Sequence, residues 1–182
     1  MNPAGTVEGD ERLRLFLALE LSRDVSEALA AWSYRFLDGG GRRIESFHVT
    51  LAFLGARPRS ELEPVISALR EASSETASFE LEPLRYRETR SVGMLVLGDE
   101  SGAATRLAVA LQSRLERLGV YRREARPWLP HVTVLRFRER PRLDPPLPAI
   151  ARFAPSGAAA FLSHLRPTGA RYEVLESYPF SQ

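Results

Sequence analysis

The sequence has 182 residues, of which 44% are hydrophobic and 26% charged, with a formal net charge of +2. This size and composition are typical of one globular domain with a sizeable core. The sequence contains no cysteine, which excludes disulfides and thiolate zinc sites, and all 25 basic residues are arginine. The absence of lysine excludes a Walker-type phosphate loop, a Schiff base and the lysine nucleophile of ATP-dependent ligases.

Neither a membrane span nor a signal peptide is indicated. No stretch approaches the ~20 apolar residues that a membrane helix needs. The N-terminal segment carries Glu8, Asp10 and Glu11 rather than a basic start followed by an apolar core. We therefore predict a flexible tail over residues 1–11, a single domain over residues 12–182, and a cytoplasmic protein that we expect to be a monomer.

The first predicted element is a strand. Leucines alternate with other residues over positions 12–21, which predicts one buried leucine face. Phe16 lies on the other face of this strand. We expect it to be partly buried under a loop, with a stacking platform for a nucleobase as the alternative.

A helix and a second strand follow. Apolar positions recur at helical spacing over residues 22–36, after a polar cap at Ser22 or Asp24, and a glycine run then ends the helix. Residues 47–54 are rich in β-branched and aromatic residues, which predicts a strand that is closed by Gly55.

The middle of the chain predicts a helix, a hairpin and another helix. Residues 60–63 match a capping box and begin a helix that continues through Leu69. Residues 79–87 and 92–97 have strand patterns separated by a short link, which predicts a hairpin. Residues 101–118 show the apolar stripe of an amphipathic helix.

The second half of the chain repeats the first. Residues 92–137 repeat the strand, helix and strand order of residues 12–55, which indicates an internal duplication. The last strand, within residues 130–137, must end or bend near Leu135, because a straight continuation would bury several unpaired arginines. This places Arg136 at the mouth of a cleft.

The C-terminal part begins with an arginine-rich segment. Seven arginines lie between positions 122 and 142, where their planar donor forks could bind phosphate or could simply form a solvated loop. A proline-rich loop over residues 141–148 follows, and residues 159–165 and 171–178 predict a final hairpin.

One short pattern occurs twice in predicted strands, as His48-Val49-Thr50 and as His131-Val132-Thr133. Side chains alternate along a strand, so each histidine shares a face with its threonine while the apolar residues face a core. Two such strands lying side by side would make a symmetric two-histidine site. The alternative is that each histidine is a hydrogen-bonded polar residue on a half-exposed strand.

Two histidines suit acid–base chemistry at phosphorus. With an ordinary pKa of about 6.5, one imidazole can be the neutral base and the other the protonated acid. The threonine hydroxyls can donate to phosphate oxygens where charge builds. No Asp, Glu or Cys shares these strand faces to complete a catalytic zinc site, so we expect no metal and no cofactor. His164 has no threonine partner and is expected at the surface.

The stretches His48-Val49-Thr50-Leu51 and His131-Val132-Thr133-Val134 resemble the two signatures of the two-histidine phosphoesterase superfamily. Within it, the chain is most similar to the bacterial and archaeal RNA 2′,3′-cyclic phosphodiesterases, historically called 2′-5′ RNA ligases. The similarity extends from Arg12 to Phe180 and includes the segment from Arg126 to Trp128.

This resemblance implies an α+β, bilobal fold in which two pseudo-symmetric antiparallel-sheet lobes with outer helices flank a central cleft. It also implies metal-independent hydrolysis of a terminal RNA 2′,3′-cyclic phosphate to a 2′-phosphomonoester. His48 would donate a proton to the leaving 3′ oxygen and His131 would accept one from water. Thr50, Thr133 and Arg136 would bind the substrate. From the residues alone, either histidine could be the acid.

Two other functions remain open at this point. The same cleft could join RNA ends through a 2′-5′ linkage without ATP. The chain could instead be a non-catalytic RNA-binding module, although such a module would be expected to have lost a histidine or threonine from one motif, and this sequence keeps all four. The expected partner is RNA with a 2′,3′-cyclic phosphate end or a small cyclic nucleotide.

Overall fold

The structure is a computed structural model that describes residues 11–166 and 169–181. The predicted tail at residues 1–11 therefore lies almost wholly outside the described residues. The elements follow in the order β1 (Arg12–Glu20), α1 (Arg23–Phe36), β2 (Arg42–Arg43), β3 (His48–Pro58), η1 (Arg59–Glu61), α2 (Leu62–Ser74), β4 (Glu82–Glu88), β5 (Val92–Gly98), α3 (Ala103–Arg117), β6 (His131–Arg136), β7 (Gly157–Arg166) and β8 (Gly169–Pro179).

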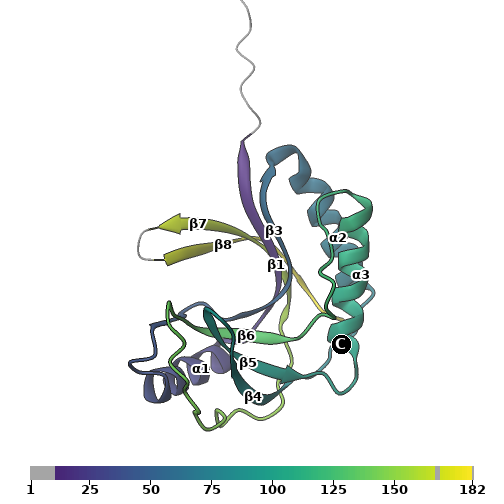
Figure 1. Cartoon of the computed structure of the whole chain (residues 1–182). Coiled ribbons are helices and arrows are strands. Elements are labelled where there is room, and N and C mark those ends of the chain that lie inside the picture. The colour runs from purple at the N-terminus through teal and green to yellow at the C-terminus, as the bar shows by residue number, and fades with distance from the viewer. Residues whose placement is uncertain (1–10, 167–168, 182) are drawn as a thin grey trace, which may run out of the picture.

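The strands form one antiparallel sheet in the order β4-β5-β6-β3-β1-β7-β8, with the short β2 paired to β6. The two motif strands, β3 and β6, are neighbours at its centre, and each is flanked on its other side by the first strand of its own repeat. The sheet curls, with α2 and α3 beside β1 and β3, and with α1 near β4 and β5 (Figure 1). This arrangement confirms the predicted α+β fold, and its sheet order follows the predicted duplication.

The main core lies on the leucine face of β1. Leu15, Leu17 and Leu19 are buried there together with Val49 of β3 and Val132 of β6. Because these valines alternate with the histidines and threonines of the motifs, burying them turns the four polar side chains toward the opposite face of the sheet. No helix among the described residues is long and apolar enough to cross a membrane.

A second, smaller cluster lies on the other face of β1. Phe16, Ala18, Ala159 and Phe161 form it, and Tyr172 packs against it. Phe16 is only 3% exposed and stacks on Phe161 with ring centroids 4.8 Å apart. The expectation that a loop partly covers Phe16 was therefore wrong. Phe16 is buried instead by side chains of neighbouring strands, since Phe161 of β7 is its partner in the β1–β7 register and Tyr172 of β8 packs edge-on against it.

The β3 strand continues beyond the point where the sequence predicted its end. It runs to Pro58, and Gly55 adopts a left-handed φ of +69° inside it. The register with β1 shifts here, since Leu15 pairs with Gly55 but Phe16 pairs with Phe53. Such a bulge interrupts the alternation of faces without ending the strand. A second shift occurs between Thr50, which pairs with Ala18, and Ala52, which pairs with Leu17. Because this second shift lies between His48 and Phe53, it turns Phe53 to the same side as His48.

The three predicted helices form. α1 begins after Ser22, whose Oγ accepts a hydrogen bond from the backbone N–H of Val25 at 3.4 Å. α2 begins at Leu62, after the turn η1, and its N-cap Glu61 makes no side-chain capping bond. Pro64 occupies the third helical position, within the first turn, where the missing N–H of proline breaks no helical hydrogen bond.

Glu88 anchors the loop that follows β6. Its side chain is only 2% exposed and accepts hydrogen bonds from the backbone N–H groups of Leu143 (2.8 Å) and Arg142 (2.9 Å) and from Arg140 Nε (3.1 Å). Burial alone would raise the pKa of this carboxyl, but these bonds and one from Tyr86 outweigh it and lower the pKa. Glu88 therefore holds the start of the proline-rich loop against the β4–β5 hairpin.

Candidate active site

The centre of the site is the junction of the two motif strands. β3 and β6 pair antiparallel at Val49 and Val132. In an antiparallel pair, the residues one step away on either side face each other across the strands, so His48 lies near Thr133 and Thr50 lies near His131. The structure thus brings together two motifs that are 83 residues apart in the sequence.

A cavity of about 850 Å³ opens over this junction. Four of the five predicted site residues line it, namely His48, Thr50, Thr133 and Arg136. His131 is not among the lining residues, but it lies close enough to lower the pKa of His48 through charge repulsion. The five predicted residues are therefore neighbours.

The hydrogen bond of His131 fixes which of its ring nitrogens carries the proton. Nδ1 lies 2.8 Å from the backbone carbonyl oxygen of Leu129. A carbonyl oxygen only accepts, so Nδ1 must be the donor, and in the neutral ring Nε2 is left with a free lone pair. His131 is thereby prepared to accept a proton at Nε2.

His48 has a very different environment. Its ring lies among those of Phe16, Tyr172 and Phe161, at centroid distances of 4.9, 5.3 and 6.0 Å. Burial in this aromatic setting lowers its pKa from 6.5 to about 4. The nearby backbone of Ser46 acts in the opposite direction and raises the pKa of His48, but by less than burial lowers it. Nδ1 of His48 has no hydrogen-bond partner of normal geometry among the described residues. His48 is therefore neutral at pH 7 in the unliganded protein.

The cavity carries a strong positive charge. Its lining includes six arginines and one carboxylate, Glu45; the arginines are Arg14, Arg42, Arg43, Arg136, Arg166 and Arg171. Arg43 is partly neutralised by Asp38 at 3.0 Å. Arginines in a cavity concentrate negatively charged ligands and match phosphate oxygens with their planar forks. The site therefore suits an anion that carries phosphate groups.

The predicted arginine cluster at positions 122–142 does not form one phosphate-binding patch. Of its members, only Arg136 lines the cavity. Arg123, Arg126 and Arg140 form ion pairs with glutamates instead. For these three arginines the structure agrees with the alternative of a charged loop, because nearby acids, including the buried Glu88 far away in the sequence, bind their guanidinium groups.

Arg136 lies where the sequence placed it, at the end of the second motif strand. β6 ends at this residue, and its side chain is exposed in the cavity. The register with β5 shifts between Thr133 and Leu135, which pair with Met94 and Gly93. This irregularity buries Val134 and Leu135 together and returns Arg136 to the side of the cavity.

Comparison with known proteins defines the family. The sequence profile of the 2′-5′ RNA ligase superfamily matches residues 21–166, a span that includes both motifs. The chain belongs to the 2′-5′ RNA ligase superfamily. An RNA 2′,3′-cyclic phosphodiesterase of Methanocaldococcus jannaschii is 21% identical over 177 residues, covering 91% of this chain and 100% of the relative.

Solved structures share the fold of this chain. TT0787 of Thermus thermophilus is 27% identical, with a TM-score of 0.79, and the match covers 92% of this chain and 98% of that protein. E. coli LigT in complex with 3′-AMP is 23% identical, also with a TM-score of 0.79, covering 94% of this chain and 100% of LigT. The latter likeness concerns the fold alone.

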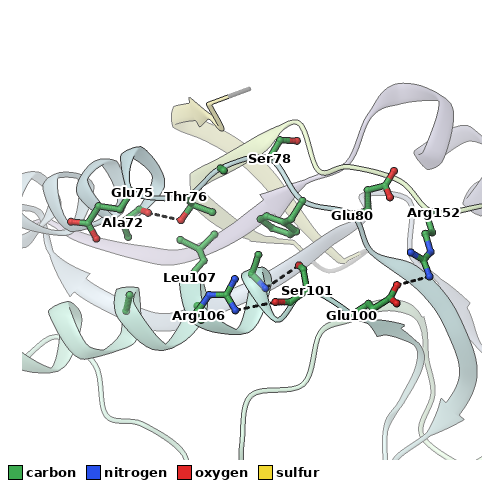
Figure 2. A pocket seen from close by; sticks show the side chains of 14 residues that line it. Ala72, Glu75, Thr76, Ser78, Glu80, Glu100, Ser101, Arg106, Leu107 and Arg152 are labelled. Atoms are coloured by element: carbon green, nitrogen blue, oxygen red, sulfur yellow. Dashed lines mark hydrogen bonds and ion pairs between the residues drawn. The ribbon is translucent and has the colours of Figure 1, made fainter.

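A second cavity, of about 700 Å³, is not a candidate for the chemistry of this 2′-5′ RNA ligase superfamily member. It lies between the end of α2 and the start of α3, and none of its lining residues is a histidine (Figure 2). Arg152 pairs with Glu100 at 2.5 Å, and Arg106 donates to the carbonyl oxygen of Ser101 at 2.9 Å. The described residues contain no group of three potential metal ligands.

The third histidine of this superfamily member lines neither cavity, although its neighbours Ser163 and Leu165 line the cavity over the motif strands. His164 is exposed on β7, and its Nε2 lies 3.0 Å from Oε2 of Glu173 on β8. This agrees with the expected surface position and makes His164 a natural control for the two motif histidines.

The lowered pKa of His48 predicts acid sensitivity of the fold. Because the unfolded chain binds this proton at higher pH than the folded protein, the stability due to neutral His48 is present above pH 6.5 and is lost as the pH falls toward 4. The loss should approach ~3 kcal/mol, the free-energy equivalent of lowering the pKa from 6.5 to about 4. Urea unfolding between pH 7 and about 4.5 should show a steeper decline for the wild type than for His48→Gln. His164→Gln is the control, and equal slopes for His48→Gln and the wild type would contradict the prediction.

Proposed function

We propose that this protein hydrolyses the 2′,3′-cyclic phosphate at an RNA end to a 2′-phosphomonoester. The observation that carries the proposal is the pairing of β3 with β6 at Val49 and Val132, which sets both histidine–threonine pairs on one face beside an arginine-lined cavity. The similarity to an RNA 2′,3′-cyclic phosphodiesterase supports this choice of substrate.

In this proposal His131 is the proton acceptor. Its Nε2 takes a proton from a water molecule while the water oxygen forms a bond to phosphorus. The hydrogen bond from Nδ1 to Leu129 keeps the lone pair on Nε2 and stabilises the positive ring that results. The pseudo-symmetry of the motifs leaves the two roles open, but this bond favours His131 as the base.

His48 is then the proton donor. As the bond between phosphorus and the 3′ oxygen breaks, His48 gives that oxygen a proton, so that one water is consumed and the phosphate stays on the 2′ oxygen. His48 is neutral without ligand, but the negative charge of a bound phosphodiester favours the imidazolium and raises its pKa. Substrate binding would therefore favour the protonated form of His48, which is the form that a proton donor requires.

The remaining residues stabilise charge. Thr50 and Thr133 lie beside the histidines and would donate hydrogen bonds to the non-bridging phosphate oxygens. Arg136, at the end of β6, would pair with the same phosphate. Both proton transfers and the charge stabilisation come from side chains in this proposal, so it requires no metal.

Product analysis tests the proposal directly. With a defined RNA bearing a 2′,3′-cyclic end, in the presence of a chelator, we expect a product that is heavier by one water and carries a 2′-phosphate. Mass spectrometry and chromatography against 2′- and 3′-phosphate standards would show this. A 3′-phosphate product or a requirement for added metal would contradict the proposal. Accumulation of joined RNA when an RNA with a 5′-hydroxyl end is supplied would favour 2′-5′ ligation instead.

A further inference from the structure

The first motif strand leaves the regular sheet pattern just after its histidine. Among the described residues, the register between β3 and β6 consists of the single pair Val49–Val132, so the ladder does not continue to Thr50 and His131. The register of β3 with β1 shifts at the same place and leaves Leu51 as the extra residue of a β-bulge. Backbone carbonyl groups at such an irregularity need hydrogen-bond donors from outside the ladder.

Two side chains from the second repeat supply these donors. The indole Nε1–H of Trp128 donates to the carbonyl oxygen of Thr50 at 3.0 Å. The amide Nε2–H of Gln112, on α3, donates to the carbonyl oxygen of Leu51 at 2.8 Å. Gln112 is only 4% exposed, so its amide lies in the core beneath the motif strand. The backbone of the first motif is therefore held by residues that are 78 and 61 positions away in the sequence.

Trp128 also lies next to the group that orients the second histidine. Its neighbour Leu129 provides the carbonyl oxygen that accepts the hydrogen bond from Nδ1 of His131. Pro130 completes the connection to β6; its φ angle is restricted by the ring, and its carbonyl oxygen accepts a bond from the backbone N–H of Leu97 at 2.9 Å. This short segment is therefore stiff, and the indole of Trp128 links it to the backbone of Thr50.

From these contacts we propose that Trp128 is a positioning residue that fixes the Thr50 hydroxyl relative to His131, while Gln112 holds the adjacent bulge. The inference rests on the proposed function, in which Thr50 binds the phosphate and His131 activates water. Both groups must meet one phosphorus centre, and a misplacement of about 1 Å can lower a rate by on the order of 10²-fold. Trp128 is not among the residues that line the cavity, so it acts through the backbone and not by contact with substrate.

The kinetic test uses Trp128→Phe, which keeps an aromatic ring but removes the N–H donor. We expect kcat for a cyclic-ended RNA to fall by about 10- to 100-fold. KM should change little, because the arginines of the cavity continue to bind the phosphate. In a Thr50→Val background the same substitution should cost a much smaller factor, since effects transmitted through one residue are not additive. Gln112→Met, which keeps the length of the side chain without its donor, should lower kcat in the same direction.

Trp32→Phe is the matched control. Its indole Nε1–H also donates to a backbone carbonyl oxygen, that of Pro146 at 2.7 Å, but neither residue lines the cavity. Trp32 is buried, so removal of this bond should affect stability at least as much as removal of the Trp128 bond. Its kcat should nevertheless match that of the wild type. An equal loss of kcat in Trp32→Phe would show a general effect of lost packing and would overturn the positioning role.

A spectroscopic test does not depend on turnover. The nitrogen resonances of neutral imidazole distinguish the two tautomers, and His131 of the wild type should be protonated at Nδ1. NMR at alkaline pH should show a mixture of tautomers for His131 in Trp128→Phe and the single Nδ1–H form in Trp32→Phe. The positioning role is overturned if Trp128→Phe keeps either the wild-type kcat or the single tautomer, and the proposed function then still stands. If the wild type opens no cyclic phosphate, the proposed function fails, while the tautomer comparison still decides whether Trp128 orients His131.

Discussion

Replacing His131 with alanine is expected to lower kcat/KM for an RNA 2′,3′-cyclic phosphate end by about 10²–10⁴-fold, the usual contribution of a positioned acid or base. Without Nε2 no side chain on this strand face can take the proton of the attacking water. His48→Ala should cause a loss of similar size through the leaving oxygen. The double variant should lose less than the product of the two effects, because residues that act in one step are not additive. Initial rates on a fluorescent cyclic-ended oligonucleotide would measure all three.

His164→Ala provides the matched control for these variants. The same imidazole is removed, but from an exposed residue that does not line the cavity and that pairs with Glu173. Circular dichroism should show the same folded state for all variants. Substantial turnover by the double variant would refute the assignment of both histidines, and a comparable loss in His164→Ala would show that the assay reports folding rather than chemistry.

The sequence was sufficient to predict the repeated elements and the motif strands. The alternation around His48 and His131 predicts strands, and their histidine and threonine side chains do share the cavity side of the sheet. Five of the arginines in the cavity were missed. Arg42 and Arg43 form a strand of only two residues, which is too short for an alternating pattern to predict it. Arg166 and Arg171 lie on the β7–β8 hairpin, and the sequence did not predict that this hairpin pairs with β1 beside the cavity.

The other features that the sequence did not predict arise from β-bulges and from packing between residues far apart in the chain. Arg14 and Phe53 are brought together by shifts in the β1–β3 register, which a period of two residues cannot predict. The sequence also could not predict that His48 and His131 have different environments, because their two motifs are nearly the same. It arises because Phe161 and Tyr172, from a hairpin more than 100 residues away, pack around His48 and have no counterpart in the contacts of His131 among the described residues.

Replacing Thr50 or Thr133 with valine is expected to lower kcat by about 10²–10³-fold, the effect of removing one hydrogen-bond donor from a site of developing charge. Valine keeps the shape and the strand preference of threonine, so the loss reports the hydroxyl. The effect should fall on kcat more than on KM, because the phosphate oxygens gain negative charge in the transition state while the arginines continue to bind the ground state.

Thr105→Val controls for the substitution itself, since the hydroxyl of Thr105 bonds to Asp99 at the start of α3, away from the cavity. Its kcat should match that of the wild type. Wild-type kcat in both Thr50→Val and Thr133→Val would mean that the hydroxyls do not contact the reacting phosphate. A loss of kcat in only one of these two variants would show that the two motifs bind the phosphate unequally. Such asymmetry would parallel the contrasting environments of His48 and His131, which favour different roles for them in proton transfer.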